Sequence, residues 1–310
     1  MLEGVPALPE TRELAMEDRA LLDALFEREQ PDVSEYTFTN LFIWRHAYGL
    51  HLSRVNGALC LFSWRSDPED SFLLPPLQAE DGPAVVEAGL RHLRENGHDP
   101  KLCRVSEAQL ERLRITGERF TIEEDRDHSD YVYSVRDLIE LPGNQFHDKR
   151  NHIAQFRAEH TFEYRPLTPD LVPACEELQD EWCDEKHCDL VASLRAESRA
   201  VKEALRHLDA LGAVGGCILA GGKVVAFALG EALNRDTVVI HIEKADPAFH
   251  GLYQLINQQF LEHQWRDYPY VNREQDMGVP GLRKAKQSYN PHHLVKKHIV
   301  RLKAARSGLG

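Results

Sequence analysis

Titratable side chains of several kinds gather near the end of the sequence. Arg273, Glu274 and Asp276 stand at the expected end of a strand that begins at Tyr270. A short basic helix is expected next, within residues 281–291. It carries three cations and a phenol: Arg283, Lys284, Lys286 and Tyr289. Acids, cations and a tyrosine in one place are the groups that general acid–base chemistry and anion binding require.

The positive charge of this stretch contrasts with the rest of the chain. The 310 residues carry a formal net charge of −13, yet residues 282–310 contain Lys and Arg and no acid. A compact positive surface on an acidic body indicates an anionic ligand held at one place. The alternative is a solvated basic face on a terminal helix and strand. The acidic body argues against duplex DNA as a partner, because duplex binding needs broad phosphate neutralisation.

The elements that position these residues follow one order, which occurs twice. In the second half, Gly221-Gly222 predicts a hairpin turn between two apolar runs, and Gly212 predicts the end of a helix. Asn56-Gly57 predicts the corresponding turn in the first half. The elements expected in the second half are strands at 161–167, 217–220, 224–229, 237–243, 270–272 and 293–302, and helices at 168–178, 197–211, 251–265 and 281–291.

This repeated order predicts an α+β fold with two domains, residues 1–140 and residues 141–310, each a mixed sheet flanked by helices. In the first half a single strand is expected from Phe120 to about Val135. The strand at residues 293–302 is expected to complete the second half. Alternation along residues 239–243 predicts that His241 faces the same way as Val239 and Glu243. The second domain is expected to carry the site.

A mixed sheet in this order resembles the GNAT acyltransferase fold, here twice in tandem, as in the Fem-type aminoacyl transferases. Three C-terminal segments and two N-terminal ones sharpen the resemblance. They are residues 240–246, 270–278, 281–291, 38–44 and 149–153. These segments resemble a bacterial family of unknown function that is grouped with the C-terminal domain of phosphatidylglycerol lysyltransferase. The resemblance covers nearly the whole chain.

The resemblance implies where the reacting groups lie. In a GNAT fold the acyl donor lies where the strand before the long helix splays from the next strand, here residues 238–243 and 270–276. It implies Glu243 or Asp276 as the base and Tyr289 as the proton donor. Substrate-binding residues are expected around them: His241, Arg273, Glu274, Arg283, Lys284 and Lys286. The structural alternative is a buried ion-pair network in which the arginines and Lys284 satisfy the acids.

The usual coenzyme A loop of GNAT enzymes is only partly present. Its nearest match is residues 248–253, where Gly251 fits. Ala248 replaces the usual Gln or Arg, and Tyr253 is bulky where the backbone must approach a pyrophosphate. Coenzyme A in the usual mode is therefore disfavoured, and no cofactor is expected. The departure agrees with a donor such as the anionic 3′ end of aminoacyl-tRNA, and equally with a fold that binds without catalysis.

Three functions follow from this reading. We favour an aminoacyl transferase acting from aminoacyl-tRNA on an amine or hydroxyl of a small molecule, peptide or lipid head group. The alternatives are an acyl-CoA-dependent N-acyltransferase and a non-catalytic module for an anionic ligand. The sequence has no P-loop, G-x-G-x-x-G or G-x-S-x-G motif, so nucleotide hydrolysis and serine hydrolase chemistry are unsupported.

Composition adds expectations about compartment and metals. No apolar run approaches the ~20 residues of a membrane helix. Residues 1–6 lack the features of a signal peptide, so we expect a cytoplasmic protein, with contact to a membrane surface left open. Six cysteines form no C-x-x-C pair, and neither a metal site nor a disulfide is expected; Cys183, His187 and Cys188 are assigned to a helix segment.

Overall fold

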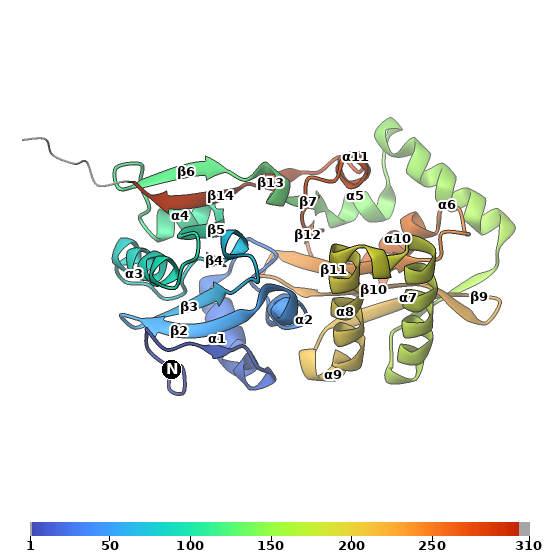
Figure 1. Cartoon of the computed structure of the whole chain (residues 1–310). Coiled ribbons are helices and arrows are strands. Elements are labelled where there is room, and N and C mark those ends of the chain that lie inside the picture. Colours follow the sequence, from blue (N-terminus) through green and yellow to red (C-terminus); the bar gives the residue numbers. More distant parts are fainter. Residues whose placement is uncertain (1, 304–310) are drawn as a thin grey trace, which may run out of the picture. The chain divides into compact units, whose positions relative to one another are not determined.

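The computed structural model describes residues 2–303, and these residues form two compact units (Figure 1). Unit 1 contains residues 2–129 and 295–303, and unit 2 contains residues 130–294. Each unit has a mixed seven-stranded sheet flanked by helices, so the predicted α+β class is confirmed. Within residues 2–303 no helix combines the length and the apolar character that crossing a bilayer requires.

Unit 1 is built on a sheet in which only β4 and β5 pair in parallel. In spatial order its strands are β1 (Arg12–Glu13), β2 (Leu50–Val55), β3 (Ala58–Ser63), β4 (Phe72–Leu73), β5 (Lys101–Ser106), β14 (Lys297–Leu302) and β6 (Phe120–Glu124). Its helices are η1 (Met16–Asp18), α1 (Arg19–Glu29), α2 (Phe38–Tyr48), η2 (Pro68–Asp70), α3 (Gly82–Glu95), α4 (Glu107–Arg112) and η3 (Arg126–His128). Leu90 and Leu93 of α3 pack in one core with Phe62 of β3.

Unit 2 is built on a sheet in which β11 and β12 run parallel while β8, β9, β10 and β11 form an antiparallel series. In spatial order its strands are β13 (His293–Val295), β7 (Asp130–Ser134), β12 (Tyr270–Asn272), β11 (Thr237–Ala245), β10 (Lys223–Ala232), β9 (Val214–Ala220) and β8 (Phe162–Pro166). Its helices are α5 (Val135–Glu140), η4 (Asn144–Phe146), α6 (His147–Glu159), η5 (Pro169–Leu171), α7 (Val172–Lys186), η6 (Cys188–Leu190), α8 (Ala192–Arg206), α9 (Leu208–Leu211), α10 (Leu252–Gln264) and α11 (Pro280–Gln287).

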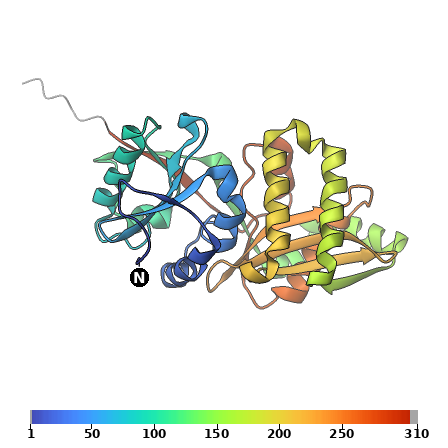
Figure 2. The same cartoon turned by 60° about the horizontal axis from the view of Figure 1, so that its bottom comes forward.

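Helices cover both faces of the unit 2 sheet. Ile218 of β9 belongs to the core that α5, α6 and α10 form with the sheet, whereas its neighbour Cys217 lies 3.6 Å from Cys175 of α7, measured between the sulfur atoms. Successive residues of a strand point to opposite faces, so α7 lies on the face opposite α10. Figure 2 shows α7 and α8 as a pair of helices that cross the strands of this sheet.

The glycine turns follow the prediction. Gly221 and Gly222 have φ values of 57° and 81° and join β9 to β10. Positive φ at both positions is what a two-residue type I′ turn requires, and glycine meets it without steric cost. Gly212, with φ 62°, ends α9, and the turn at Asn56-Gly57 joins β2 to β3. These predicted hairpins and this helix end are confirmed.

Two predicted strands are wrong, because each divides between the two sheets. The strand expected from Phe120 to Val135 is β6 in unit 1 and β7 in unit 2, and the strand expected at residues 293–302 is β13 and β14. Figure 1 shows β14, drawn red, beside green β6, and β14 also pairs with β5. Alternation in a strand predicts which face is buried but not which sheet the strand joins. The predicted domain boundary falls at the end of α5, inside unit 2, and two tandem domains at 1–140 and 141–310 stay a prediction.

The turn between α7 and α8 corrects a second expectation. Cys183 and Cys188 form a disulfide, although no disulfide was expected from the sequence. His187, between them, adopts a left-handed conformation with φ 52° and ends α7. This reversal brings the two cysteines together, which a continuous helix would not do.

Candidate functional site

The unit 2 sheet opens at the carboxyl ends of β11 and β12. The two strands pair over three positions, from Thr237↔Tyr270 to Val239↔Asn272, and then β12 ends while β11 continues to Ala245. The Asn272 side chain fastens this end: it accepts from the Glu274 backbone N–H at 2.8 Å and donates to Asp130 at 2.9 Å. The carboxyl ends of parallel strands where neighbouring strands part are common ligand sites in α/β sheets.

A β-bulge in β11 sets which side chains turn toward this opening. Ile240 pairs with Gly230 and Ile242 pairs with Leu229, so His241 has no partner in the ladder. Val238 and Ile240 before the bulge and Ala245 after it all belong to the core on the α10 side. The alternation therefore changes phase within β11, as bulges commonly do next to functional sites.

The bulge overturns the prediction that His241 faces the same way as Glu243. Glu243 accepts a hydrogen bond from Asn257 of α10 at 2.7 Å. His241 instead bonds to Glu231 of the neighbouring β10. A one-residue bulge leaves no trace in the hydrophobic pattern, so simple alternation could not reveal it.

Six side chains of unit 2 gather where β11 and β12 part, and we call them the Arg273 cluster. They come from β11, α10, the loop after β12, α11 and the segment after it, and α6: Glu243, Asn257, Arg273, Lys286, Tyr289 and Lys149. The guanidinium of Arg273 lies at the centre. Its Nη2 donates to Glu243 Oε2 at 2.5 Å, and its central carbon lies 4.8 Å from the ring centroid of Tyr289.

Arg273 is buried, and its one ion pair uses only part of its hydrogen-bonding capacity. Its side chain is 14% exposed, and its Nε and Nη1 atoms have no hydrogen-bond partner among the described residues. Burial acts to lower the pKa of Arg273, but the charge of Glu243, the nearby tyrosines and the hydrogen bond to Glu243 together raise the pKa above its ordinary value. The guanidinium thus stays charged while some of its N–H groups lack an acceptor. A buried N–H group without an acceptor destabilises the folded protein.

Two lysines add positive charge to the cluster. Lys149 Nζ donates to Ser288 Oγ at 2.7 Å and lies 4.3 Å from the Tyr289 ring centroid, and its pKa is lowered by burial and by Arg273. Lys286 Nζ donates to the carbonyl oxygen of Arg273, and burial together with the charge of Arg273 lowers its pKa to about 8. With both lysines protonated, the six residues of the cluster carry three positive charges and one negative charge, that of Glu243, while Glu274 and Asp130 also act on Lys286 from outside the cluster.

Tyr289 is suited to donate a proton. It is 7% exposed and packs in the core beside Tyr133, with the two ring centroids 6.4 Å apart. Burial raises the pKa of Tyr289 to about 12, with Arg273 opposing the shift and Glu243 adding to it. The phenol therefore keeps its proton at neutral pH, as a general acid must.

His241 and Glu274 form a separate group. The His241 ring is 1% exposed, and its Nδ1 and Nε2 each lie 2.9 Å from a carboxylate, Glu274 and Glu231 respectively. Burial acts to lower the pKa of His241, but the hydrogen bonds to Glu231 and Glu274 and the charges of these carboxylates together raise it to about 9. A protonated histidine between two carboxylates ties β10, β11 and the loop after β12 together.

Asp276 lies in a third group. Its buried carboxylate accepts from Arg283 Nε and Nη2, both at 2.8 Å, and from the Tyr131 hydroxyl at 2.6 Å. Burial would raise the pKa of Asp276, but the bonds from Arg283 and Tyr131 outweigh it and hold the pKa well below its ordinary value. This geometry favours an anchor for α11 over the base role predicted for Asp276. Lys284, on the same helix, is exposed.

Helix α6 packs against Gly251, in the loop that precedes α10. Gly251 precedes α10 with φ 83°, and a Cβ on it would lie 2.1 Å from the carbonyl oxygen of His152. The His152 and His250 rings meet beside it, with Nδ1 and Nε2 2.5 Å apart. Tyr253 accepts a hydrogen bond from Trp182 at 3.1 Å. The close approach of α6 explains why a side chain would not fit at position 251.

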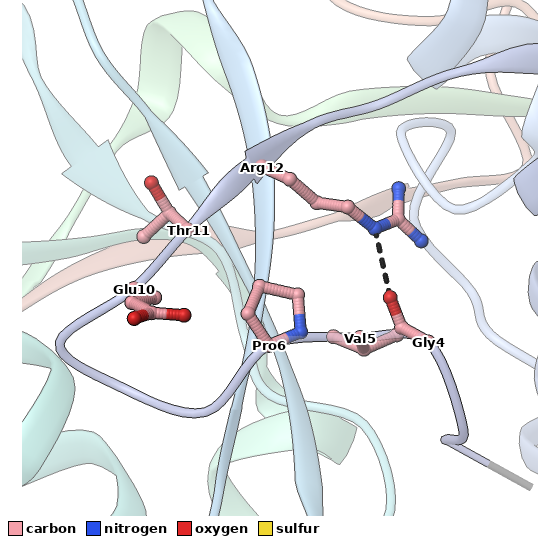
Figure 3. A pocket seen from close by; sticks show the side chains of 6 residues that line it. All are labelled: Gly4, Val5, Pro6, Glu10, Thr11 and Arg12. Atoms are coloured by element: carbon pink, nitrogen blue, oxygen red, sulfur yellow. Dashed lines mark hydrogen bonds between the residues drawn. The ribbon is translucent and has the colours of Figure 1, made fainter.

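Two surface pockets lie away from the Arg273 cluster. In unit 1 a cavity of about 580 Å³ is lined by the N-terminal loop and β1, and there Arg12 donates to the Gly4 carbonyl at 3.1 Å (Figure 3). Arg12 also pairs with Asp18, so its charge is met. In unit 2 a cavity of about 700 Å³ lies beside the Cys183–Cys188 disulfide and is lined by both acids and cations of α7 and α8. Neither cavity holds the predicted site residues.

The predicted site residues thus divide into three groups. Glu243, Arg273, Lys286 and Tyr289 come together, as expected for a reactive centre. Sequence reasoning missed Asn257 and the part played by Lys149. Asn257 is a buried polar residue among the mostly apolar buried residues of α10, which is a recognisable signal. Lys149 lies on α6, more than ninety residues before the other members of the cluster, and no local pattern connects it to them.

The comparisons with known proteins indicate one protein family. A profile of the family described as "Phosphatidylglycerol lysyltransferase, C-terminal" matches residues 26–301. Among curated proteins, an uncharacterized protein of Mycoplasmoides gallisepticum is 22% identical over 189 residues. That match covers 56% of this chain and 56% of the relative, so it spans little more than half of the relative's length.

Solved structures extend the signal over nearly the whole chain. A conserved protein of unknown function from Bacteroides thetaiotaomicron is 34% identical, with a TM-score of 0.85, covering 94% of this chain and 99% of that one. The C-terminal domain of a putative lysylphosphatidylglycerol synthetase from Agrobacterium fabrum shares the fold at 12% identity and a TM-score of 0.63, covering 93% and 92%. A tandem GNAT protein from the clavulanic acid biosynthesis pathway has a TM-score of 0.50 at 11% identity, covering 96% and 99%.

Proposed function

The chain belongs to the phosphatidylglycerol lysyltransferase C-terminal family, and from that premise we propose that it is an acyltransferase whose reactive centre is the Arg273 cluster. The observation that carries the proposal is the convergence of Glu243, Arg273 and Tyr289 where β11 and β12 part. The GNAT-like structural neighbours support the same reaction class and the view that the chain is two GNAT-like domains in tandem. We propose residues 141–310 as the domain that carries the site.

The donor we propose is an aminoacyl-tRNA, and the acceptor an amine or hydroxyl of a small molecule, a peptide or a lipid head group. One observation supports an aminoacyl ester over an acyl-CoA: α6 packs so closely on Gly251 that a Cβ there would lie 2.1 Å from the His152 carbonyl oxygen, in the loop where GNAT enzymes hold a pyrophosphate. The positive charge of the Arg273 cluster suits an anionic donor of either kind. Arg283, Lys284 and Lys286 were predicted as an anion clamp, and of these Lys286 is the one that reaches the cluster.

The reaction requires one proton to be removed and one to be delivered. The acceptor nitrogen or oxygen attacks the carbonyl carbon of the aminoacyl ester, and Glu243 takes the proton that this atom loses. The carbon–oxygen bond of the ester then breaks, and Tyr289 delivers a proton to the departing tRNA oxygen. Asn257 holds Glu243 at Oε1 while Arg273 holds it at Oε2, so the carboxylate is positioned from both sides.

The test of this proposal separates turnover from binding. Glu243→Gln and Tyr289→Phe keep the shape of each side chain but remove the base and the acid. We expect aminoacyl transfer to fall about 10²- to 10⁴-fold for either variant, with donor binding retained, because general acid–base catalysis contributes roughly that factor. Glu163→Gln, which removes an exposed acid on β8, is the matched control and should keep full turnover.

A non-catalytic anion-binding module is the second candidate, and one observation favours it. Both carboxylate oxygens of Glu243 already accept hydrogen bonds, as they would in a structural ion-pair network. A module of this kind would show no transfer to any acceptor, and donor binding would be unchanged in Glu243→Gln and Tyr289→Phe while falling in Arg283→Ala. Unchanged turnover in Glu243→Gln and Tyr289→Phe would remove the Arg273 cluster as the reactive centre.

A further inference from the structure

The Arg273 cluster contains more positive charge and more hydrogen-bond donors than its own residues use. Nη2 of Arg273 donates a hydrogen bond to Glu243, while Nε and Nη1 are buried without a partner among the described residues. Two aromatic rings lie beside the guanidinium: the ring centroids of Tyr289 and Tyr133 are 4.8 Å and 5.7 Å from its central carbon. Ring faces attract the cation but do not replace an oxygen acceptor for its N–H groups.

Lys149 and Lys286 also have more hydrogen-bond donors than partners. An ammonium group has three N–H donors, and the contacts described use one on each side chain: Lys149 to Ser288 and Lys286 to the Arg273 carbonyl. Among the described residues, Arg273 is the one of these three cations that has a carboxylate, Glu243, within hydrogen-bond distance. The charges of Glu274 and Asp130 also act on Lys286, and that of Asp148 acts on Lys149, but none of these acids bonds a lysine of the cluster.

The cluster also has a solvent-facing end. Ser288 is exposed and Lys149 is half-buried, whereas Tyr289 behind them is buried. An anion from solvent would therefore reach the cluster from the side of Lys149, whose ammonium group bonds Ser288.

We propose that Arg273, Lys149 and Lys286 form a binding site for one oxyanion, a phosphate or carboxylate group carried by a substrate. The inference deepens the proposed function and rests on it only for the statement that the anion belongs to a substrate. Such an anion would supply the missing acceptor for the guanidinium and would neutralise the excess charge. It would lie next to Glu243 and Tyr289, where it would hold the reacting part of the substrate beside the base and the acid.

The site is tested without turnover, by isothermal titration calorimetry of the full chain at constant ionic strength. One arm uses inorganic phosphate and the other uses acetate, so the two sources of an oxyanion are distinguished. We expect saturable binding of one of them at a single site. Lys149→Gln and Lys286→Gln should each weaken it about tenfold, the effect of one lost hydrogen bond to a charged group. Lys223→Gln, which removes an exposed lysine of the same unit, should bind like wild type.

Chemical labelling gives a second readout that does not depend on variants. Acetylation by an N-hydroxysuccinimide ester at pH 8, followed by peptide mass spectrometry, should show Lys149 and Lys286 protected by the bound anion and Lys223 unprotected. The proposal is overturned if neither anion binds saturably, or if Lys223→Gln weakens binding as much as Lys149→Gln. If Glu243→Gln loses turnover but no anion binds, the anion site is wrong while the proposed reaction is still supported.

Discussion

At the scale of single residues, the organising feature of unit 2 is how its buried charges are paired. His241 lies between two carboxylates, Asp276 accepts from both Arg283 and Tyr131, and Arg273 has one carboxylate and two unused nitrogens. In the first two groups, each charged side chain has several hydrogen-bond partners of opposite charge or polarity. In the third group, buried N–H donors of Arg273 lack an acceptor. A ligand that supplies this acceptor would stabilise the protein most, because a buried donor without a partner is costly.

The closed histidine group predicts a pH dependence of stability. The pKa of His241 is about 9 in the folded protein against an ordinary 6.5. A raised folded pKa stabilises the protein fully below pH 6.5, and the contribution is lost as the pH rises through 9. The difference corresponds to about 3 kcal/mol. His241→Gln should therefore lower the free energy of unfolding much more at pH 6 than at pH 10, as measured by urea denaturation.

Comparing the variant with wild type at each pH removes the contribution of Lys286. Its pKa of about 8 lies below the ordinary lysine value of 10.5, so this group makes the free energy of unfolding rise between pH 8 and 10.5, and it does so in both proteins. An equal loss of stability at pH 6 and pH 10 would mean that His241 is not protonated between its two carboxylates.

At the scale of elements, the bulge in β11 and the ends of short strands decide which side chains meet. The residues of the Arg273 cluster come from β11, α10, α6 and the segments around α11, and the early end of β12 gives them room. Charge and spacing predicted Glu243, Arg273 and Tyr289 as one centre. They could not predict that Asp276 belongs elsewhere, because its partner Tyr131 lies on β7, 145 residues away.

The division of strands between sheets shows the same limit. Hairpins such as β9–β10 follow from local turn chemistry, and Gly221-Gly222 predicted this one correctly. The strand at residues 293–302 was placed in the wrong sheet, because its pairing with β5 and β6 joins segments almost two hundred residues apart. Pairing partners at that separation depend on the whole packed core, and a hydrophobic pattern does not encode them.

The α7–α8 turn carries a stability prediction of its own. The Cys183–Cys188 disulfide closes a loop with a sequence separation of 5 residues. Loop-closure entropy for so short a loop gives a stabilisation of about 2 kcal/mol. Cys188→Ser should therefore lower the free energy of unfolding by about that amount in urea without reductant. In excess dithiothreitol the variant and the wild type should converge; a wild type that is unaffected by reductant would show that the disulfide does not form.

At the scale of the whole molecule, the chain builds two mixed sheets and concentrates its candidate chemistry in one of them. Unit 2 alone, residues 130–294, contains each residue of the Arg273 cluster. Unit 1 also holds buried ion pairs, among them Lys297 with Glu35 and Arg104 with Asp125. Each charge in those pairs faces an opposite charge, and Lys297 fixes β14 in the sheet of unit 1. In unit 2 the Arg273 cluster differs from these pairs, because its three cations share one carboxylate among the cluster's own residues.

The central claim, an acyltransferase that takes its acyl group from aminoacyl-tRNA, is tested most directly by binding. Acetyl-CoA, uncharged tRNA and aminoacyl-tRNA would each be titrated against the purified chain at two salt concentrations. The account predicts salt-sensitive binding of tRNA, stronger when the tRNA is aminoacylated, and no saturable binding of acetyl-CoA. Saturable acetyl-CoA binding without tRNA binding would contradict the proposed donor, and binding of none of the three would contradict the proposed transferase.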